Sequence, residues 1–278
     1  MLRLLNIEFI KLWNNRSSKI LILAYFILLT SIALIAAIKF DIGPVKFHLA
    51  DQGIFDFPYI WHFNTYVAGT LKFFLAIVIV SMMANEYSNK TIKQNLIDGL
   101  SKKEFIASKF VTVSAFALIS TLFVFIITLI LGLSFSDNTE AYHVFSDTEY
   151  LLAFFVKLVG FFSICLFLGI LVKRSAFALG FLFVWYIIEK IAYGLLRWEI
   201  TATEHSWENI TRFFPLESMS NLIKEPATRL GAAKELAKQV GEEFSFDYAV
   251  HWYEIAIVLV WTALFIYWSY ILLKKRDL

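Results

Sequence analysis

The sequence predicts an all-α polytopic membrane protein with six transmembrane helices, and two observations support this prediction. The chain has 278 residues, of which 59% are hydrophobic and only 17% charged, and its mean hydropathy is +0.68. Soluble domains are usually about 45–50% apolar and about 25% charged. Six long apolar stretches account for this composition, and each should be helical because backbone amides in lipid must be satisfied within the segment. We expect a single transmembrane domain over residues 1–278.

The first predicted span, Ile20–Ile38, contains no charged residue and is long enough to cross the roughly 30 Å hydrocarbon core. A long charged segment precedes it, which argues against a secretory signal peptide. The fourth and fifth spans are separated only by Lys173 and Arg174, so we expect a tight helical hairpin there. The predicted spans are 20–38, 61–84, 110–135, 151–172, 175–196 and 255–273.

The distribution of Lys and Arg residues among the loops predicts the orientation of the chain. These residues concentrate in the first tail, in the loop after the second span, in the hairpin and in the last tail, whereas the acidic loop after the third span has none. Both termini are therefore expected on the cytoplasmic side. The long segment 197–252, between the fifth and sixth spans, is expected on the external side.

Residues 2–13 precede the first span and favour an amphipathic helix. One stripe of this helix carries the apolar residues Leu2, Leu5, Phe9, Leu12 and Trp13. The polar residues Arg3, Glu8, Lys11 and Asn14 lie largely on the other side. Such a helix lies in the membrane interface with its apolar face among the lipid headgroups. An ordinary basic tail that follows the positive-inside rule is the alternative interpretation.

The loop between the second and third spans, residues 85–109, predicts a short helix, a turn and the start of a new helix. Ile92 and Leu96 are four residues apart, and a glycine then provides a helix stop. Ser101 and Glu104 form an S-x-x-E capping box before the next apolar run. We call residues 85–109 the elbow. A compact, positively charged elbow is a suitable surface for a soluble partner, although a plain intracellular loop would show the same pattern.

The elbow resembles the cytoplasmic loop of permease subunits in type-2 ABC exporters. That loop carries a Glu, a Gly-Thr pair four residues later, then a Pro, a Ser-Arg pair and a Lys at the start of the next helix. This sequence departs from the pattern with Lys90 at the Gly position, Gly99 at the Pro position and a lysine at the Arg position. The residues that carry the resemblance are Glu86, Thr91, Ser101, Lys102 and Lys109.

The resemblance extends over the chain, from the interfacial first helix to the long external segment. It implies that Thr91–Asp98 is a coupling helix in a groove of an ATP-binding subunit, with ATP and Mg²⁺ bound by that partner and no cofactor bound by this chain. It also implies export, a second permease subunit, identical or related, and a bacterial inner membrane. The residues expected to serve the coupling are Glu86, Thr91, Ile92, Asn95, Leu96, Ser101, Lys102 and Lys109.

Several other chemistries are disfavoured by the sequence. The chain contains no G-x-x-x-x-G-K-[ST] loop, so it cannot hold ATP phosphates by that mechanism, and we expect no catalytic residue in it. A net charge of +2 gives no argument for a nucleic-acid partner. The single cysteine, Cys165, cannot form an internal disulfide or a CxxC metal site. No metal-site spacing occurs among Glu204, His205, Glu208 and His251.

Four lysine or glutamate residues lie within the predicted spans, namely Lys72, Lys157, Glu189 and Lys190. Such groups face a bundle interior or a cavity unless they snorkel to the headgroups. Across the hairpin, Glu189 is level with Lys157, which favours an ion pair that would lock the fourth and fifth spans together. Snorkelling of each lysine toward the external headgroups is the alternative.

The external segment 197–252 is rich in aromatic residues, as is typical of the membrane interface. Trp207–Leu222 resembles the short re-entrant helices of the exporter family. Pro226–Gly241 predicts a small amphipathic helix from the spacing of its apolar residues.

Together these patterns favour the membrane subunit of an ATP-driven exporter that forms the substrate pathway as a dimer in contact with lipid. An ion-coupled secondary transporter would use the buried charges, but the spans show neither paired broken helices nor an inverted repeat. A membrane-bound enzyme would need a converging reactive site. A scaffold or sensor would use the elbow to recruit a partner without moving cargo.

Overall fold

The computed structural model describes residues 2–38, 40–42, 45–47, 53–199, 206–226, 229 and 247–276. Its helices are α1 Leu2–Asn14, α2 Arg16–Ala37, α3 Tyr59–Thr70, α4 Lys72–Ser88, α5 Thr91–Ile97, α6 Lys102–Phe135, α7 Ala141–Phe145, α8 Glu149–Val172, α9 Ser175–Glu199, α10 Ser206–Thr211, α11 Pro215–Asn221 and α13 Trp252–Lys275. An antiparallel ribbon of β1 Phe40–Ile42 and β2 Val45–Phe47 follows α2. This ribbon was not predicted, because strands of three residues are too short to show an alternating pattern.

The predicted class of fold, a helical protein with several membrane spans, is confirmed. Helices α2, α6, α8, α9 and α13 are each long and apolar enough to cross a membrane. The second span differs from a single straight helix, because α3 and α4 meet at Leu71 with a bend of 42°. Gly69 and Thr70 precede the break, and the Thr70 hydroxyl bonds back to the carbonyl of Val67. A glycine and a back-bonded hydroxyl both weaken the helical ladder at this point.

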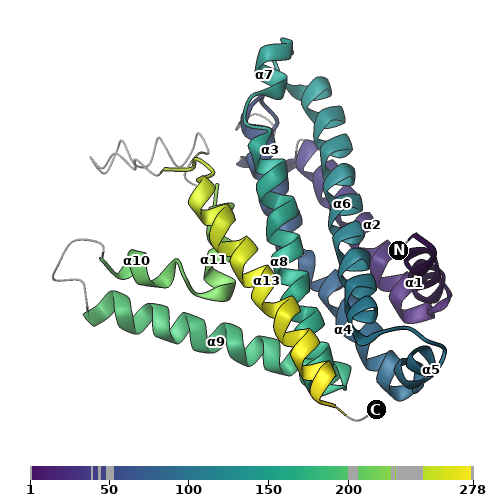
Figure 1. Cartoon of the computed structure of the whole chain (residues 1–278). Coiled ribbons are helices and arrows are strands. Elements are labelled where there is room, and N and C mark those ends of the chain that lie inside the picture. The colour runs from purple at the N-terminus through teal and green to yellow at the C-terminus, as the bar shows by residue number, and fades with distance from the viewer. Residues whose placement is uncertain are drawn as a thin grey trace.

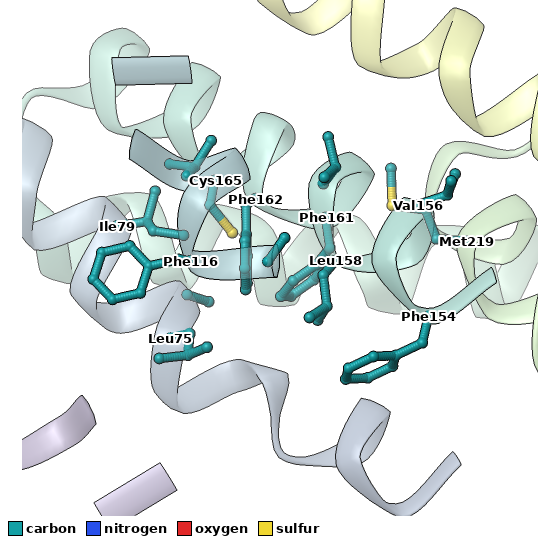
Figure 2. Packing of buried hydrophobic residues seen from close by; sticks show 14 of the residues in the cluster. Leu75, Ile79, Phe116, Phe154, Val156, Leu158, Phe161, Phe162, Cys165 and Met219 are labelled. Atoms are coloured by element: carbon teal, nitrogen blue, oxygen red, sulfur yellow. The ribbon is translucent and has the colours of Figure 1, made fainter. Parts of the chain in front are cut away.

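Helix α8 forms the centre of the bundle (Figure 1). In the span that contains α8, 78% of the apolar stretch is buried, compared with 17% for α2 and 11% for α9. Figure 2 shows Leu75 of α4 and Phe116 of α6 close to Phe162 and Cys165 of α8. Cys165 is a buried free thiol, as expected for an inert core residue. The outer helices therefore keep most of their apolar surface for lipid or another subunit.

Helices α8 and α9 do not form the close hairpin that the sequence predicts. The turn itself is tight, since Lys173 ends α8 in the left-handed conformation with φ 65° and α9 begins at Ser175. Beyond the turn, α9 runs away from α8, and α10 and α11 lie between α9 and α13 (Figure 1). The expectation of a tight hairpin is wrong beyond the turn, because α11 and a cavity separate the two helices.

The predicted N-terminal helix is present as α1, but its orientation differs from a simple interfacial helix. Glu8 is 5% exposed and Leu12 is buried with it, whereas Ile10 and Trp13 are exposed. The placement of Glu8 on the solvent side was wrong, because a lysine of α6 inside the bundle binds its carboxylate. Helix α1 therefore packs on the bundle through an acidic residue as well as through apolar ones.

The segment 197–252 contains α10 and α11 in the region Trp207–Leu222, where short helices were expected, and α11 packs against α8, α9 and α13. Most of Pro226–Gly241 lies outside the described residues, as do Glu204, His205 and the side chain of Glu208. The imidazole Nε2 of His251 lies 2.7 Å from the carboxylate of Asp247. Among the residues that the structure describes, no three potential ligands gather as a metal site.

Candidate coupling elbow and membrane cavity

The elbow folds into the short helix and new helix start that its sequence predicts. Lys90 adopts a left-handed conformation with φ 56°, and α5 begins at the next residue. Gly99 follows α5 with φ 97°, a region that glycine enters without steric cost. The Ser101 hydroxyl accepts a hydrogen bond from the Glu104 amide, and the Glu104 carboxylate accepts one from the Ser101 amide. The predicted capping box is therefore confirmed, and α5 and α6 are held at a fixed turn.

Four charged side chains from three helices form a cluster beneath α5, which we call the charge cluster; three of them are buried, and the fourth, Lys11, is exposed at its edge. Lys109 of α6 is fully buried and binds the carboxylates of Glu8 from α1 and Glu86 from α4, with a distance of 2.6 Å between Lys109 Nζ and Glu86 Oε1. Lys11 Nζ lies 3.0 Å from Glu86 and 3.2 Å from Glu8. Two acids and two bases balance one another, as buried charges require.

The charge cluster also reaches α5 itself. The Thr91 hydroxyl donates to the Glu86 carboxylate and lies 3.3 Å from the Glu86 backbone carbonyl. Burial by itself lowers the pKa of Lys11, but the carboxylates of Glu8 and Glu86 outweigh burial and raise that pKa above its usual value. Lys11 therefore stays charged at neutral pH. Three positions that carry the exporter resemblance, Glu86, Thr91 and Lys109, thus meet at one point and position α5.

The predicted coupling residues on α5 lie on its buried and half-buried faces, and none of them is fully exposed. Ile92 is 2% exposed and anchors the helix on the bundle. Asn95 and Leu96 are half-buried. Ile97 is 75% exposed, although sequence reasoning did not select it. The sequence feature that could have identified Ile97 is its position five residues after Ile92, because in a helix with 3.6 residues per turn this spacing places it on the opposite side.

Lys102 and Arg276 join three helix ends beside the elbow. The Lys102 amine donates to the carbonyls of Lys274 and Arg276, at 3.3 and 3.0 Å. The Arg276 guanidinium donates to the carbonyls of Ile170 and Leu171 at the end of α8, the latter at 2.8 Å. The start of α6 and the ends of α8 and α13 are therefore linked. We call this part of the bundle, which carries α5 and Arg276, the elbow end, and the part that carries α7 the far end.

A second feature is a cavity of about 560 Å³ bounded by α3, α4, α8, α9 and α11. The four residues Lys72, Lys157, Glu189 and Lys190, which the sequence places within spans, line it. Most of the remaining wall is apolar. Of the environments considered for these charges, the structure has them at the wall of a cavity.

A comparison with known protein families agrees with the elbow and with the helical architecture. Residues 8–278 match the family model described as ABC-2 family transporter protein. The chain belongs to the ABC-2 transporter family. It is a membrane subunit of an ABC transporter, a permease without the ATPase domain. No curated protein matches the chain.

In this permease, the predicted ion pair between Lys157 and Glu189 is not formed. The Glu189 carboxylate accepts hydrogen bonds from the backbone amides of Leu216 and Glu217, each at 3.0 Å, and from the Trp185 indole at 2.6 Å. A helix start leaves such amides without partners inside the helix, and a carboxylate is a favourable acceptor there. The sequence could not reveal this partner, because it lies 27 residues away on the short helix α11.

The neighbouring residue on α9 strengthens the same contact. The Lys190 amine lies 2.6 Å from the Glu217 carboxylate. Glu189 and Lys190 together therefore fasten the far half of α9 to α11, a joint that we call the α9–α11 clip. Lys157, by contrast, has no ion pair in the described part of the chain, and its amine is 3.5 Å from the carbonyl of Ser220.

Proposed function

We propose that this permease is the membrane half of an ATP-driven exporter, that it works as a pair of permease subunits, and that separate ATPase subunits drive it through α5. ATP and Mg²⁺ would be held by those partners. A nucleotide can shift the permease between two states only if the ATPase contacts the two states differently. The chain therefore needs a rigid handle that transmits movement of the partner into the bundle.

The charge cluster is the observation that carries this proposal. Lys109 is fully buried and bound to carboxylates from α1 and α4, and Glu86 is hydrogen-bonded to Thr91 at the start of α5. Removing one partner of a buried ion pair typically costs about 3–5 kcal/mol. Displacement of α5 would therefore move α1, α4 and α6 with it, instead of bending a loose loop. Helix α5 presents the exposed Ile97 at its outer surface for a partner.

The pairing with a second permease subunit is supported by unequal burial. Helices α2 and α9 leave most of their apolar surface uncovered, with 17% and 11% of their spans buried. Lipid can cover such surface equally well. A second subunit would therefore bind at α2 and α9, where it would disturb the internal packing of the bundle least.

A photo-crosslinking residue in place of Ile97 tests the coupling. In cells that also express the candidate ATPase, we expect crosslinks from position 97 to a protein with a nucleotide-binding motif. Tyr142 of α7 is the matched control position, because it is 80% exposed but lies at the far end. Crosslinks to the ATPase from position 142, or none from position 97, would contradict the proposal.

A charge substitution gives an independent measurement. Ile97→Asp should reduce co-purification of the ATPase at least tenfold, because it places a charge in an apolar contact. Phe145→Asp, on the exposed face of α7 at the far end, should leave co-purification unchanged. Both variants should elute from a sizing column as the wild-type protein does.

A further inference from the structure

Two amines in the membrane cavity have no carboxylate partner among the residues that the structure describes. Lys157 is 5% exposed and its amine is 3.5 Å from the Ser220 carbonyl. Lys72 lies with its amine 4.4 Å from the centroid of the Phe161 ring. The other charged groups of the wall are already engaged, since the α9–α11 clip pairs Lys190 with Glu217 and binds Glu189 to backbone amides. The cavity therefore has two amines without a countercharge.

Both amines lie at the break between α3 and α4. A Cβ atom on Gly69, in the last turn of α3, would be 3.7 Å from Lys157 Nζ. Lys72 is the first residue of α4. The first turn of a helix has amides without intrahelical partners and the positive end of the helix dipole. The break therefore places the partial positive charge of the α4 start at Lys72, whereas Lys157 lies beside the last turn of α3, whose carbonyl end carries partial negative charge.

The remainder of the wall is suited to a hydrocarbon chain. Ile77, Phe161, Leu179 and Leu182 line the cavity with Phe73 and Phe183. Phe73 is 51% exposed and Phe183 is 64% exposed, so these residues belong to the outer surface of the bundle as well as to the cavity. The chain leaves this side open toward the surrounding membrane, and a molecule can enter from the lipid phase.

We propose that this cavity binds an anionic amphiphile, with its negatively charged headgroup on Lys72 and Lys157 and its apolar chain along Phe161, Leu182 and Phe183. A buried charge is stable when an opposite charge accompanies it, and the ligand supplies that charge. A phosphate or carboxylate on one apolar chain meets both requirements. The proposal concerns binding and does not depend on the ATP-driven cycle.

The test uses the full chain in phosphatidylcholine nanodiscs, with hexadecyl phosphate as the probe and hexadecyl maltoside as the neutral analogue. We expect hexadecyl phosphate to bind at least tenfold more tightly than the maltoside. Lys157→Gln and Lys72→Gln should each weaken phosphate binding at least tenfold. Lys103→Gln is the matched control, because Lys103 lines a separate apolar groove of about 530 Å³ between α6 and α13, and it should have no effect.

A second measurement needs no substitution and therefore does not depend on the folding of the variants. A photoactivatable alkyl phosphate should label peptides from α4, α8 and α9 in the wild-type protein. Competition by phosphatidylglycerol would identify a membrane lipid as a ligand, and absence of competition would restrict the site to single-chain anions. Equal binding of the phosphate and the maltoside, or labels confined to other helices, would overturn the proposal.

Discussion

The amine of Lys109 has the most demanding environment among the charged residues of the elbow. It is fully buried and contacts two carboxylates that belong to different helices. Loss of this single positive charge would leave Glu8 and Glu86 with Lys11 alone. Since the exposed fraction of the Lys11 side chain is 38%, Lys11 cannot replace a buried partner. Stability of the elbow therefore depends on one side chain that is buried within the permease.

Lys109→Met should lower the free energy of unfolding by about 3–5 kcal/mol, because it leaves buried carboxylates without their countercharge. Thermal unfolding of the purified permease in detergent measures this loss. Lys103→Met, on the exposed part of the same helix, should change the unfolding temperature little. Equal effects of the two substitutions would show that the charge cluster does not stabilise the elbow.

The backbone of Lys90 explains why the exporter pattern has glycine at this position. Lys90 has φ 56°, a conformation that costs residues other than glycine about 1 kcal/mol. Lys90→Gly should therefore stabilise the permease by about 1 kcal/mol. Lys93→Gly should destabilise it by about the same amount, since Lys93 lies inside α5 and glycine weakens helix interiors. In chemical denaturation, the midpoint should therefore rise above the wild-type value for Lys90→Gly and fall below it for Lys93→Gly.

At the scale of elements, α8 can lie at the centre because its glycines allow close contact. A Cβ atom on Gly160 would lie 2.7 Å from Val258 of α13, and one on Gly169 would lie 2.8 Å from Met83 of α4. Real Cβ atoms do not approach so closely, so these positions set the distances between helices. Small residues have this role in membrane bundles, where close packing replaces the hydrophobic driving force.

Gly160→Ala should lower stability by about 1–3 kcal/mol, because the added methyl group overpacks the contact with α13. A second substitution, Val258→Ala, should recover part of the loss by removing the atom that clashes. Gly180→Ala is the control, since a Cβ atom at Gly180 on α9 meets nothing within 4 Å. The unfolding temperatures of the wild type, the Gly160→Ala and Val258→Ala variants and the double variant form a double-mutant cycle. If the effects of the two single substitutions simply add in the double variant, Gly160 and Val258 are not in direct contact.

The individual helices and their starts could largely be predicted from the sequence, whereas contacts between helices could not. Uninterrupted apolar runs predicted the spans, and the Ser101–Glu104 capping box predicted the start of α6, because both signals are local. The partners of Glu8 and Glu189 could not be predicted, since they lie on helices distant in sequence. Helical position placed Glu8 with the solvent-facing residues, whereas a buried lysine on another helix decides its orientation.

At the scale of the whole molecule, the elbow and α7 lie at opposite ends of the bundle (Figure 1). The charge pattern predicts that the elbow lies in the cytoplasm. Cysteine labelling should therefore modify Tyr142→Cys in intact cells and Ile97→Cys only after permeabilisation. The native Cys165 is buried and gives no background. Labelling of both positions from outside would contradict the orientation.

The joint made by Lys102 and Arg276 has a mechanical consequence. A helix of the length of α8 rises by about 36 Å, and its elbow end is tied to α6 and α13. A tilt of about 10° about that tied end would shift the opposite tip by about 6 Å. The cavity residues on α8, Lys157 and Phe161, lie near the middle of the helix, so they would shift by about 3–4 Å. A modest rotation at the elbow end would thus change the width of the cavity, without any helix having to unfold.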